Sequence, residues 1–193
     1  KVWTASKVEK GIPYIVGQHG NNYGTCVWRG SWCWPERMTS DKFITWGWTT
    51  SENEIPAFVF SNAGRRSRQF DNAGGLLLIE RCREPSSCNY DTHYEFIMYM
   101  EEQFRFVEYL PEHIQQKLIV RLLAYAQGDG SYVDQLWNDR SNHIKTERGV
   151  LNIRKLISQS RLIVHSYDST GILETLALNI PTICFWRDDL SHL

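Results

Sequence analysis

The sequence has no long apolar run, no paired cysteine motif and no excess of one charge, and each absence excludes a class of protein. No apolar run reaches the roughly 18 residues that a membrane-spanning helix requires. The five cysteines are scattered and form no Cys-x-x-Cys pair, so they fit reduced thiols better than a zinc site or a disulfide framework. The formal net charge is −1, so no global field attracts nucleic acid. We therefore expect a cytoplasmic protein, with peripheral association at the inner face of the cytoplasmic membrane left open.

The composition is otherwise that of a globular protein that can bury a core. The chain has 193 residues, of which 42% are hydrophobic and 22% charged, and this length predicts one domain or slightly more. Eight tryptophans and nine tyrosines are many for this length, but such residues fill cores and interfaces more often than they contact carbohydrates or nucleobases. Because the sequence starts and stops directly in patterned segments, we expect a piece of a longer protein.

Two strands are expected in the first third of the chain. A short apolar run at 12–16 leads into the glycine-flanked turn Gly17-Gln18-His19-Gly20, and α/β domains present side chains at a sheet edge in this way. A second strand, rich in aromatic and β-branched residues, is expected at 42–48.

A polar, glycine-bearing stretch follows from residue 49 to residue 75. We place the linker between two domains within it, at 61–75. The stretch includes the basic residues Arg65, Arg66 and Arg68. Such clusters are usually solvated, although this one could contact a phosphate or an anionic acceptor.

The second half alternates strand-like apolar runs with amphipathic helical stretches. A long helix is expected at 93–109, where Phe96, Met100, Phe104 and Val107 recur at helical spacing. The other expected elements are strands at 76–79, 117–122, 161–164 and 182–186, a short strand near 144, and helices at 149–158 and 170–178. The last strand, helix and strand form a βαβ unit, which implies parallel strands. The fold class is therefore α/β with a Rossmann-like parallel sheet.

The turn between the last two strands is the place where open parallel sheets bind ligands. Ser169 or Thr170 is the natural N-cap of the helix that follows, and backbone N–H groups there favour an anion. Glu174 lies one turn further and suits the hydroxyl groups of a ribose, while His165 can donate to a phosphate. Asp168 argues against this, because a carboxylate beside a phosphate is unfavourable unless it points outward. The ordinary alternatives are a helix cap, a solvated glutamate and a hydrogen-bonded histidine.

The last segment carries a resemblance to a known family. Its pattern is His165-x-x-Asp168-Ser169-Thr170-x-x-x-Glu174-x-Leu176-Ala177-x-Asn179-x-Pro181-Thr182. This pattern resembles the C-terminal donor-binding motif of GT-B glycosyltransferases. More narrowly, the chain is similar to the LIC12162-type transferases of bacterial surface-carbohydrate and O-antigen biosynthesis. The other matching pieces are Gly17-Gln18-His19-Gly20-Asn21-Asn22-Tyr23-Gly24, Thr45-Trp46-Gly47-Trp48 and Val120-Arg121-Leu122.

The resemblance implies a GT-B-type arrangement of two Rossmann-like domains. Residues 1–60 would be the end of the N-terminal, acceptor-side domain, 61–75 the linker, and 76–193 a truncated nucleotide-sugar-binding domain. A complete enzyme of this type is about twice as long, and its N-terminal part, where a catalytic base is usually found, would lie outside this chain. The stretch Ala124-Tyr125-Ala126-Gln127 departs from the expected pattern, since an acidic, polar loop is typical there. This weakens the case that the loop binds the donor.

The resemblance also implies functional roles for six residues: His19, Arg121, His165, Ser169, Thr170 and Glu174. Arg121, His165, Ser169 and Thr170 would hold the donor phosphates, without an essential metal or a further cofactor. Glu174 would hold the ribose. His19 is the candidate catalytic residue, either as a contact to the acceptor or the donor sugar or as a base. For Arg121 the alternative is an interdomain ion pair.

We expect a glycosyltransferase that moves a sugar from a nucleotide sugar to a cell-surface polysaccharide or lipopolysaccharide. Its acceptor would be a glycan or a lipid-linked molecule. Nucleotide-sugar epimerases and polyol-phosphate transferases share much of this architecture and stay open as alternatives. A non-catalytic nucleotide-binding module is an alternative of another class. Nucleic-acid binding is disfavoured by the balanced charge. We expect the chain on its own to bind nucleotide without turning over a donor.

Overall fold

The computed structural model describes residues 2–21, 23, 35–64, 70–81, 93–122 and 130–185. These residues form two compact units. The first holds the described residues between 2 and 64 together with Asp168–Leu178, and the second holds those between 70 and 167 together with 179–185. The basic cluster at 65–68, the stretch Ala124-Tyr125-Ala126-Gln127 and every cysteine except Cys184 lie outside the described residues.

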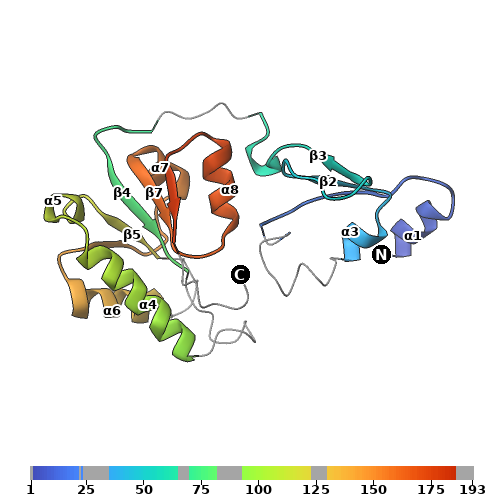
Figure 1. Ribbon diagram of the computed structural model, residues 1–193. Coiled ribbons are helices and arrows are strands. Elements are labelled where there is room, and N and C mark those ends of the chain that lie inside the picture. The colour runs from blue at the N-terminus through green and yellow to red at the C-terminus, as the bar shows by residue number, and fades with distance from the viewer. Residues whose placement is uncertain are drawn as a thin grey trace. The chain divides into compact units, whose positions relative to one another are not determined.

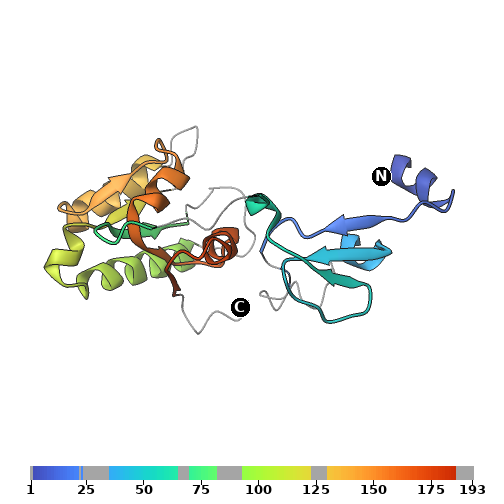
Figure 2. The ribbon, with the colours of Figure 1, turned by 90° about the horizontal axis from the view of Figure 1, so that it is seen from above.

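The first unit contains a small parallel sheet, whose strands lie side by side in Figure 2 in the order β1-β2-β3. Its strands are β1 (Ile15–Gly17), β2 (Lys42–Thr45) and β3 (Glu54–Pro56). Its helices are α1 (Val2–Val8), α3 (Pro35–Thr39), the short 3-10 helix η1 (Phe60–Asn62) and α8 (Thr170–Ala177). The sheet is centred on β2, whose Phe43 is fully buried and stacks obliquely on Tyr23.

The strand expected at 42–48 is too long, because β2 ends at Thr45. The chain turns there: Gly47 has φ +95°, which favours glycine, and the Thr45 hydroxyl donates to the carbonyl oxygen of Trp48. The third strand, β3, lies in the polar stretch after residue 49. Apolar and polar residues do not alternate regularly there, so the sequence does not predict this strand.

The second unit is a five-stranded sheet in the order β6-β5-β4-β7-β8, and all its pairs are parallel. The strands are β4 (Gly75–Ile79), β5 (Ile119–Arg121), β6 (Lys145–Glu147), β7 (Ser160–His165) and β8 (Thr182–Cys184). The helices are α4 (His93–Glu108), α5 (Glu112–Gln115), α6 (Gly130–Ser141) and α7 (Ile153–Ser158). The expected α/β class with a Rossmann-like parallel sheet is confirmed.

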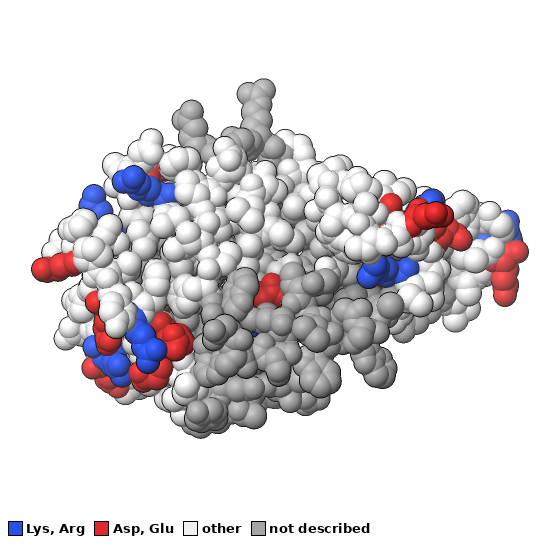
Figure 3. All heavy atoms as spheres, in the orientation of Figure 1, with Lys and Arg blue, Asp and Glu red and all other residues white. Residues whose placement is uncertain are grey.

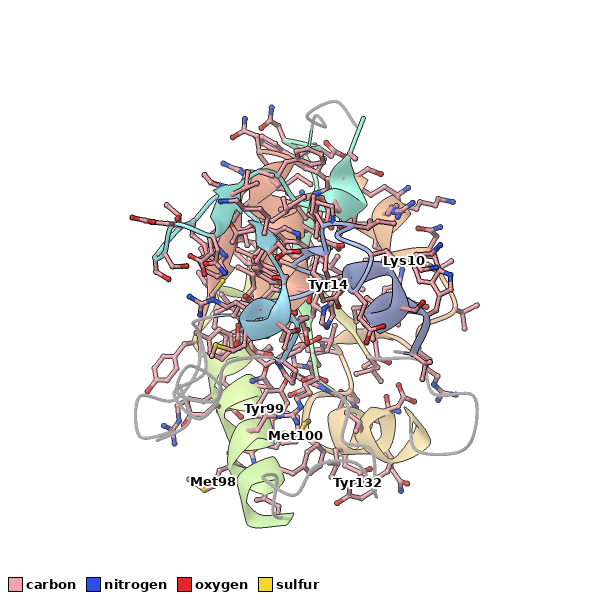
Figure 4. The ribbon with its side chains drawn as sticks, turned by 90° about the vertical axis from the view of Figure 1, so that its right-hand side faces the viewer. Lys10, Tyr14, Met98, Tyr99, Met100 and Tyr132 are labelled. Carbon is pink, nitrogen blue, oxygen red and sulfur yellow. The ribbon has the colours of Figure 1, made fainter. Side chains whose placement is uncertain are left out.

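Helices α4 and α6 cover one face of this sheet (Figure 1). The apolar stripe expected on the long helix is confirmed, since its four members are all buried in one cluster with sheet residues. The cluster consists of Leu78, Phe96, Met100, Phe104, Val107, Leu118, Val120, Leu122, Val133, Trp137, Ile144 and Val164. In Figure 4, Tyr99 and Met100 of α4 point into the unit and Met98 points away. The opposite face of the sheet is also closed, because Leu77 and Ile163 are fully buried.

Candidate functional site

The order of the second sheet reverses between β4 and β7. From β4 the chain adds β5 and β6 on one side, and β7 and β8 then lie on the other. In open parallel sheets, such a reversal is the usual place for a ligand, beyond the carboxyl ends of the two strands. The residues that leave the sheet there are Glu80, Arg81 and Ser166.

Glu80 is a fully buried carboxyl group at this reversal point, with 1% of its surface exposed. The indole N–H of Trp137 donates to both of its oxygens, at 3.1 Å and 3.2 Å. Burial raises the pKa of Glu80 to about 8, and the hydrogen bond from Trp137 opposes this only in part. The side chain is therefore largely neutral near pH 7.

Tyr99 connects helix α4 to both strands at the reversal point. Its hydroxyl accepts from the backbone N–H of Arg81 at 2.8 Å and lies 2.8 Å from the hydroxyl of Ser166. Ser166 in turn donates to the carbonyl of Ile79 at 3.3 Å. Burial and the nearby Glu80 raise the pKa of Tyr99 well above its usual value, so the phenol keeps its proton. Within the described part of the chain, the amide oxygen of the buried Gln103 on the same helix accepts no hydrogen bond.

Neither Glu80 nor Tyr99 is among the residues predicted from the sequence. One signal was present for Glu80, because it directly follows the apolar run Leu76 to Ile79 and so stands at the carboxyl end of a predicted strand. Tyr99 carries no such signal, since it lies beside the apolar stripe of a helix and resembles any aromatic residue that packs there.

Arg121 and His165 lie on the same face of the second sheet, but they do not meet. Both are in register with Ile79 on the strand between them, so their backbones are about 10 Å apart. The Arg121 guanidinium instead pairs with Glu147 on β6, the strand on the far side from β7. The pair is nearly buried, and it lies within one sheet rather than between domains.

Glu147 is held by more than this one partner. Its carboxylate also accepts from the backbone N–H groups of Val150 at 2.7 Å and Leu151 at 2.9 Å. Burial alone would raise the pKa of Glu147, but the Leu151 N–H and the charge of Arg121 outweigh it, and the pKa is lowered. The carboxylate therefore stays charged and keeps the guanidinium in place.

His165 ends β7 and is completely buried. Burial lowers its pKa to about 4, so the imidazole is neutral near pH 7. A neutral imidazole can supply a ring N–H to a ligand but brings no positive charge.

In the first unit, the turn after β1 binds directly to the N-terminal end of α8. The backbone N–H of Asn21 donates to the Thr170 hydroxyl at 3.1 Å. The Asn21 side-chain amide donates to the carboxylate of Asp168 and, at 3.2 Å, to the carbonyl of Ser169. Asn21 is buried and stands 147 residues from Asp168 in the sequence, so the contact is tertiary. The carboxylate that the sequence analysis found unfavourable at this position thus has an amide partner.

Gln18 joins this turn to the turn after β2. It is almost fully buried, with 1% exposed. Its amide group donates to the carbonyl of Gly20 at 2.7 Å, and its oxygen accepts from the backbone N–H of Trp46 at 3.0 Å and the indole of Trp48 at 2.9 Å. Two motifs that are separate in the sequence therefore form one hydrogen-bonded structure around a single side chain.

His19 lies on the same turn and its side chain is 67% exposed. Its Nδ1 is 2.8 Å from the Tyr23 hydroxyl, and this hydroxyl donates to Glu36 at 2.8 Å. Nδ1 and the Glu36 carboxylate are 3.6 Å apart. The sequence predicts His19 as a site residue but gives no sign of either partner.

Helix α8 carries the three remaining candidates. Ser169 is the N-cap with an extended backbone, and its hydroxyl makes no capping hydrogen bond to the first turn. Thr170 opens the helix, and Glu174 follows one turn later on the same side. Glu174 is half-buried, and its carbonyl accepts from the Asn62 amide at 2.8 Å, which ties the helix to η1.

A comparison with protein-family models matches all 193 residues to the LIC12162 family of transferases. The chain belongs to this family. The resemblance inferred from its motifs is thereby confirmed, and the protein is a transferase. No curated protein matches the chain.

Two further observations concern membranes and metal ions. No helix among them is long and apolar enough to cross a membrane. In the same residues, no three histidine, cysteine, aspartate or glutamate side chains come together as metal ligands would. On the face shown in Figure 3, basic and acidic side chains lie side by side rather than in a patch of one sign, in agreement with the balanced net charge.

Proposed function

We propose that this transferase moves a sugar from a nucleotide-sugar donor to a glycan or lipid-linked acceptor used in building a cell-surface polysaccharide. The observation that carries the proposal is the N-terminal end of α8. Its first hydroxyl, on Thr170, accepts from Asn21 and so keeps its own proton to donate. Backbone N–H groups and the helix dipole favour an anion at such an end.

The donor's phosphates would therefore bind at Ser169 and Thr170. The Asn21 amide supports this assignment, because it engages the Asp168 carboxylate that would otherwise repel a phosphate. Glu174 would accept hydrogen bonds from the ribose hydroxyl groups, one helical turn from the phosphate.

The second unit has its own candidates at the carboxyl ends of its strands, where His165 would supply a neutral ring N–H to a ligand. Arg121 would add positive charge at that edge of the sheet. Since Glu147 already holds its guanidinium, this contribution is smaller than the sequence alone suggests.

In the transfer itself, the bond between the anomeric carbon and the phosphate oxygen breaks, and a bond from that carbon to an acceptor oxygen forms. The leaving nucleotide carries away the bonding electrons, so its phosphate gains negative charge. In this scheme the helix end and the N–H donors stabilise that charge, without a metal ion.

Calorimetric titration of the chain with CMP, UDP, GDP and CDP tests the proposal. We expect one nucleotide to bind, and Thr170→Val and Glu174→Gln each to weaken binding about tenfold, or about 1.4 kcal/mol. The matched control is Glu52→Gln, an exposed carboxylate in the same unit, which should bind as the unaltered chain does.

Two outcomes would overturn the proposal. One is the absence of binding by a chain that circular dichroism shows to be folded. The other is equal binding by the two α8 variants and the control. Where binding is found, chromatography of the products that the full-length protein forms from the matching nucleotide sugar separates sugar transfer from epimerisation. The absence of any product from the full-length protein identifies a binding module.

A further inference from the structure

Hydrogen bonds link three side chains in a row, and the imidazole of His19 is at one end of this row. Nδ1 lies 2.8 Å from the oxygen of Tyr23, and the Tyr23 hydroxyl lies 2.8 Å from Oε1 of Glu36. The three residues come from the turn after β1 and from helix α3, so all three belong to the first unit.

The donor in each hydrogen bond follows from the number of protons available. A carboxylate can only accept, so the single proton of the Tyr23 hydroxyl goes to Glu36. The Tyr23 oxygen must then accept from His19, and Nδ1 of His19 carries the proton. In a neutral imidazole only one nitrogen is protonated. Nε2 of His19 is therefore the basic nitrogen.

Tyr23, the middle residue of the three, is held rigidly. The residue is 8% exposed, and its ring packs on the buried Phe43. Burial raises the pKa of Tyr23, and the hydrogen bond and charge of Glu36 raise it further, while the backbone N–H of His19 opposes them in part. The phenol keeps its proton at any working pH, so the direction of the hydrogen bonds does not change.

The turn that carries His19 is fastened to α8. Gly20, the next residue, approaches Thr170 so closely that an added Cβ would lie 3.3 Å from its hydroxyl oxygen. Asn21 then binds Thr170 and Ser169 directly. Because consecutive Cα atoms are about 3.8 Å apart, the backbone of His19 lies within about 9 Å of the helix end assigned above to the donor phosphates.

The geometry points to Tyr23 and Glu36 as positioning residues that hold His19 as its Nδ1–H tautomer, so that Nε2 acts as the general base on the acceptor hydroxyl. This inference rests on the proposed function. Nε2 takes the proton as the acceptor oxygen bonds to the anomeric carbon, and the bond from that carbon to the donor phosphate breaks. The imidazolium that forms is stabilised by Glu36 through Tyr23, and it returns its proton to solvent after the product leaves.

The tautomer can be measured without any substrate, from the ¹⁵N chemical shifts of the imidazole nitrogens at a pH where the ring is neutral. His19→Asn identifies the resonance among the six histidines. We expect Nδ1 protonated in the unaltered chain and a change toward Nε2–H in Glu36→Gln. In this variant, the new amide donates to Tyr23, and the phenol proton turns toward Nδ1. Glu52→Gln is a matched control in the same unit that should leave the tautomer unchanged.

Cleavage of CMP-, UDP-, GDP- and CDP-linked sugars by the full-length protein, measured as nucleotide release with a simple glycoside as acceptor, tests the role as base. We expect a loss of about 100-fold or more in kcat for His19→Asn and of about tenfold for Glu36→Gln, with nucleotide affinity unchanged in both.

An Nε2–H tautomer in the unaltered chain overturns the inference, whether or not nucleotide binds. An Nδ1–H tautomer together with equal cleavage by the full-length protein and its His19→Asn variant overturns the role as base. Failure of the proposed function has a different signature, which is a folded chain that binds no nucleotide.

Discussion

Glu80 should make the free energy of unfolding fall as the pH rises from 5 to 8. Replacing Glu80 by glutamine should remove most of this pH dependence. Burial raises its pKa from 4.5 to about 8, so between these values the folded chain keeps a proton that the unfolded chain has released. The resulting stability is complete below the unfolded pKa and is lost as the pH rises through the folded one. From pH 5 to pH 8 the loss is about 3.5 kcal/mol, since each pH unit contributes about 1.36 kcal/mol between the two pKa values and less close to either of them.

Glutamine suits this position because it keeps the shape of the side chain and can still accept the indole hydrogen bond of Trp137. Urea denaturation followed by circular dichroism, at pH 5, 6, 7 and 8, measures the effect. Glu80→Gln should be more stable than the unaltered chain at pH 8, and the difference between them should shrink toward pH 5. Glu112→Gln, on the exposed surface of the same unit, is the control for loss of one carboxylate. If the unaltered chain and Glu80→Gln lose stability equally from pH 5 to pH 8, the buried carboxyl is charged and the reasoning fails.

Two further substitutions test the hydrogen bonds around the candidate site. Gln18→Met should lower the free energy of unfolding by about 2–4 kcal/mol and speed amide hydrogen exchange in the turns that Gln18 joins, because three polar groups lose their partner. The control is Gln116→Met at an exposed position, which should change neither quantity. Arg121→Met should lower it by about 3 kcal/mol by leaving the Glu147 carboxylate nearly buried without its cation. Adding Glu147→Gln to Arg121→Met should recover part of this loss, and purely additive effects in that double-mutant cycle would contradict an energetic coupling.

The expected course of the second unit could be predicted from its sequence because the signals are local. The stripe of Phe96, Met100, Phe104 and Val107 identifies α4, and all four residues are buried as expected. The apolar runs flanking the helix at 170–177 identify a βαβ unit, and β7 and β8 are indeed parallel neighbours. In the first unit the same reasoning overextends β2, because a Gly47 turn interrupts an aromatic run that otherwise resembles a strand.

The candidate site could be predicted only in part. Ser169 was one of two expected caps and is the N-cap, and Arg121 and His165 stand at strand ends as expected. The sequence predicts neither the ion pair of Arg121 nor the charge state of His165. Arg121 pairs with a carboxylate on a neighbouring strand, and His165 is buried deeply enough to be neutral. Ionisation depends on burial, and burial is a property of the packed chain.

The α/β class, the parallel strands and the family of the chain could all be predicted from residue patterns, because periodicity and short motifs are local and need no tertiary information. Which polar groups meet depends on how the chain packs. Asn21 reaches Asp168 across 147 residues, Trp137 reaches Glu80 across 57, and Tyr23 connects His19 to Glu36. These contacts set which imidazole nitrogen is basic and which carboxyl is neutral. Hydrogen bonds and desolvation act over a few ångströms in space, and distance along the chain does not predict them.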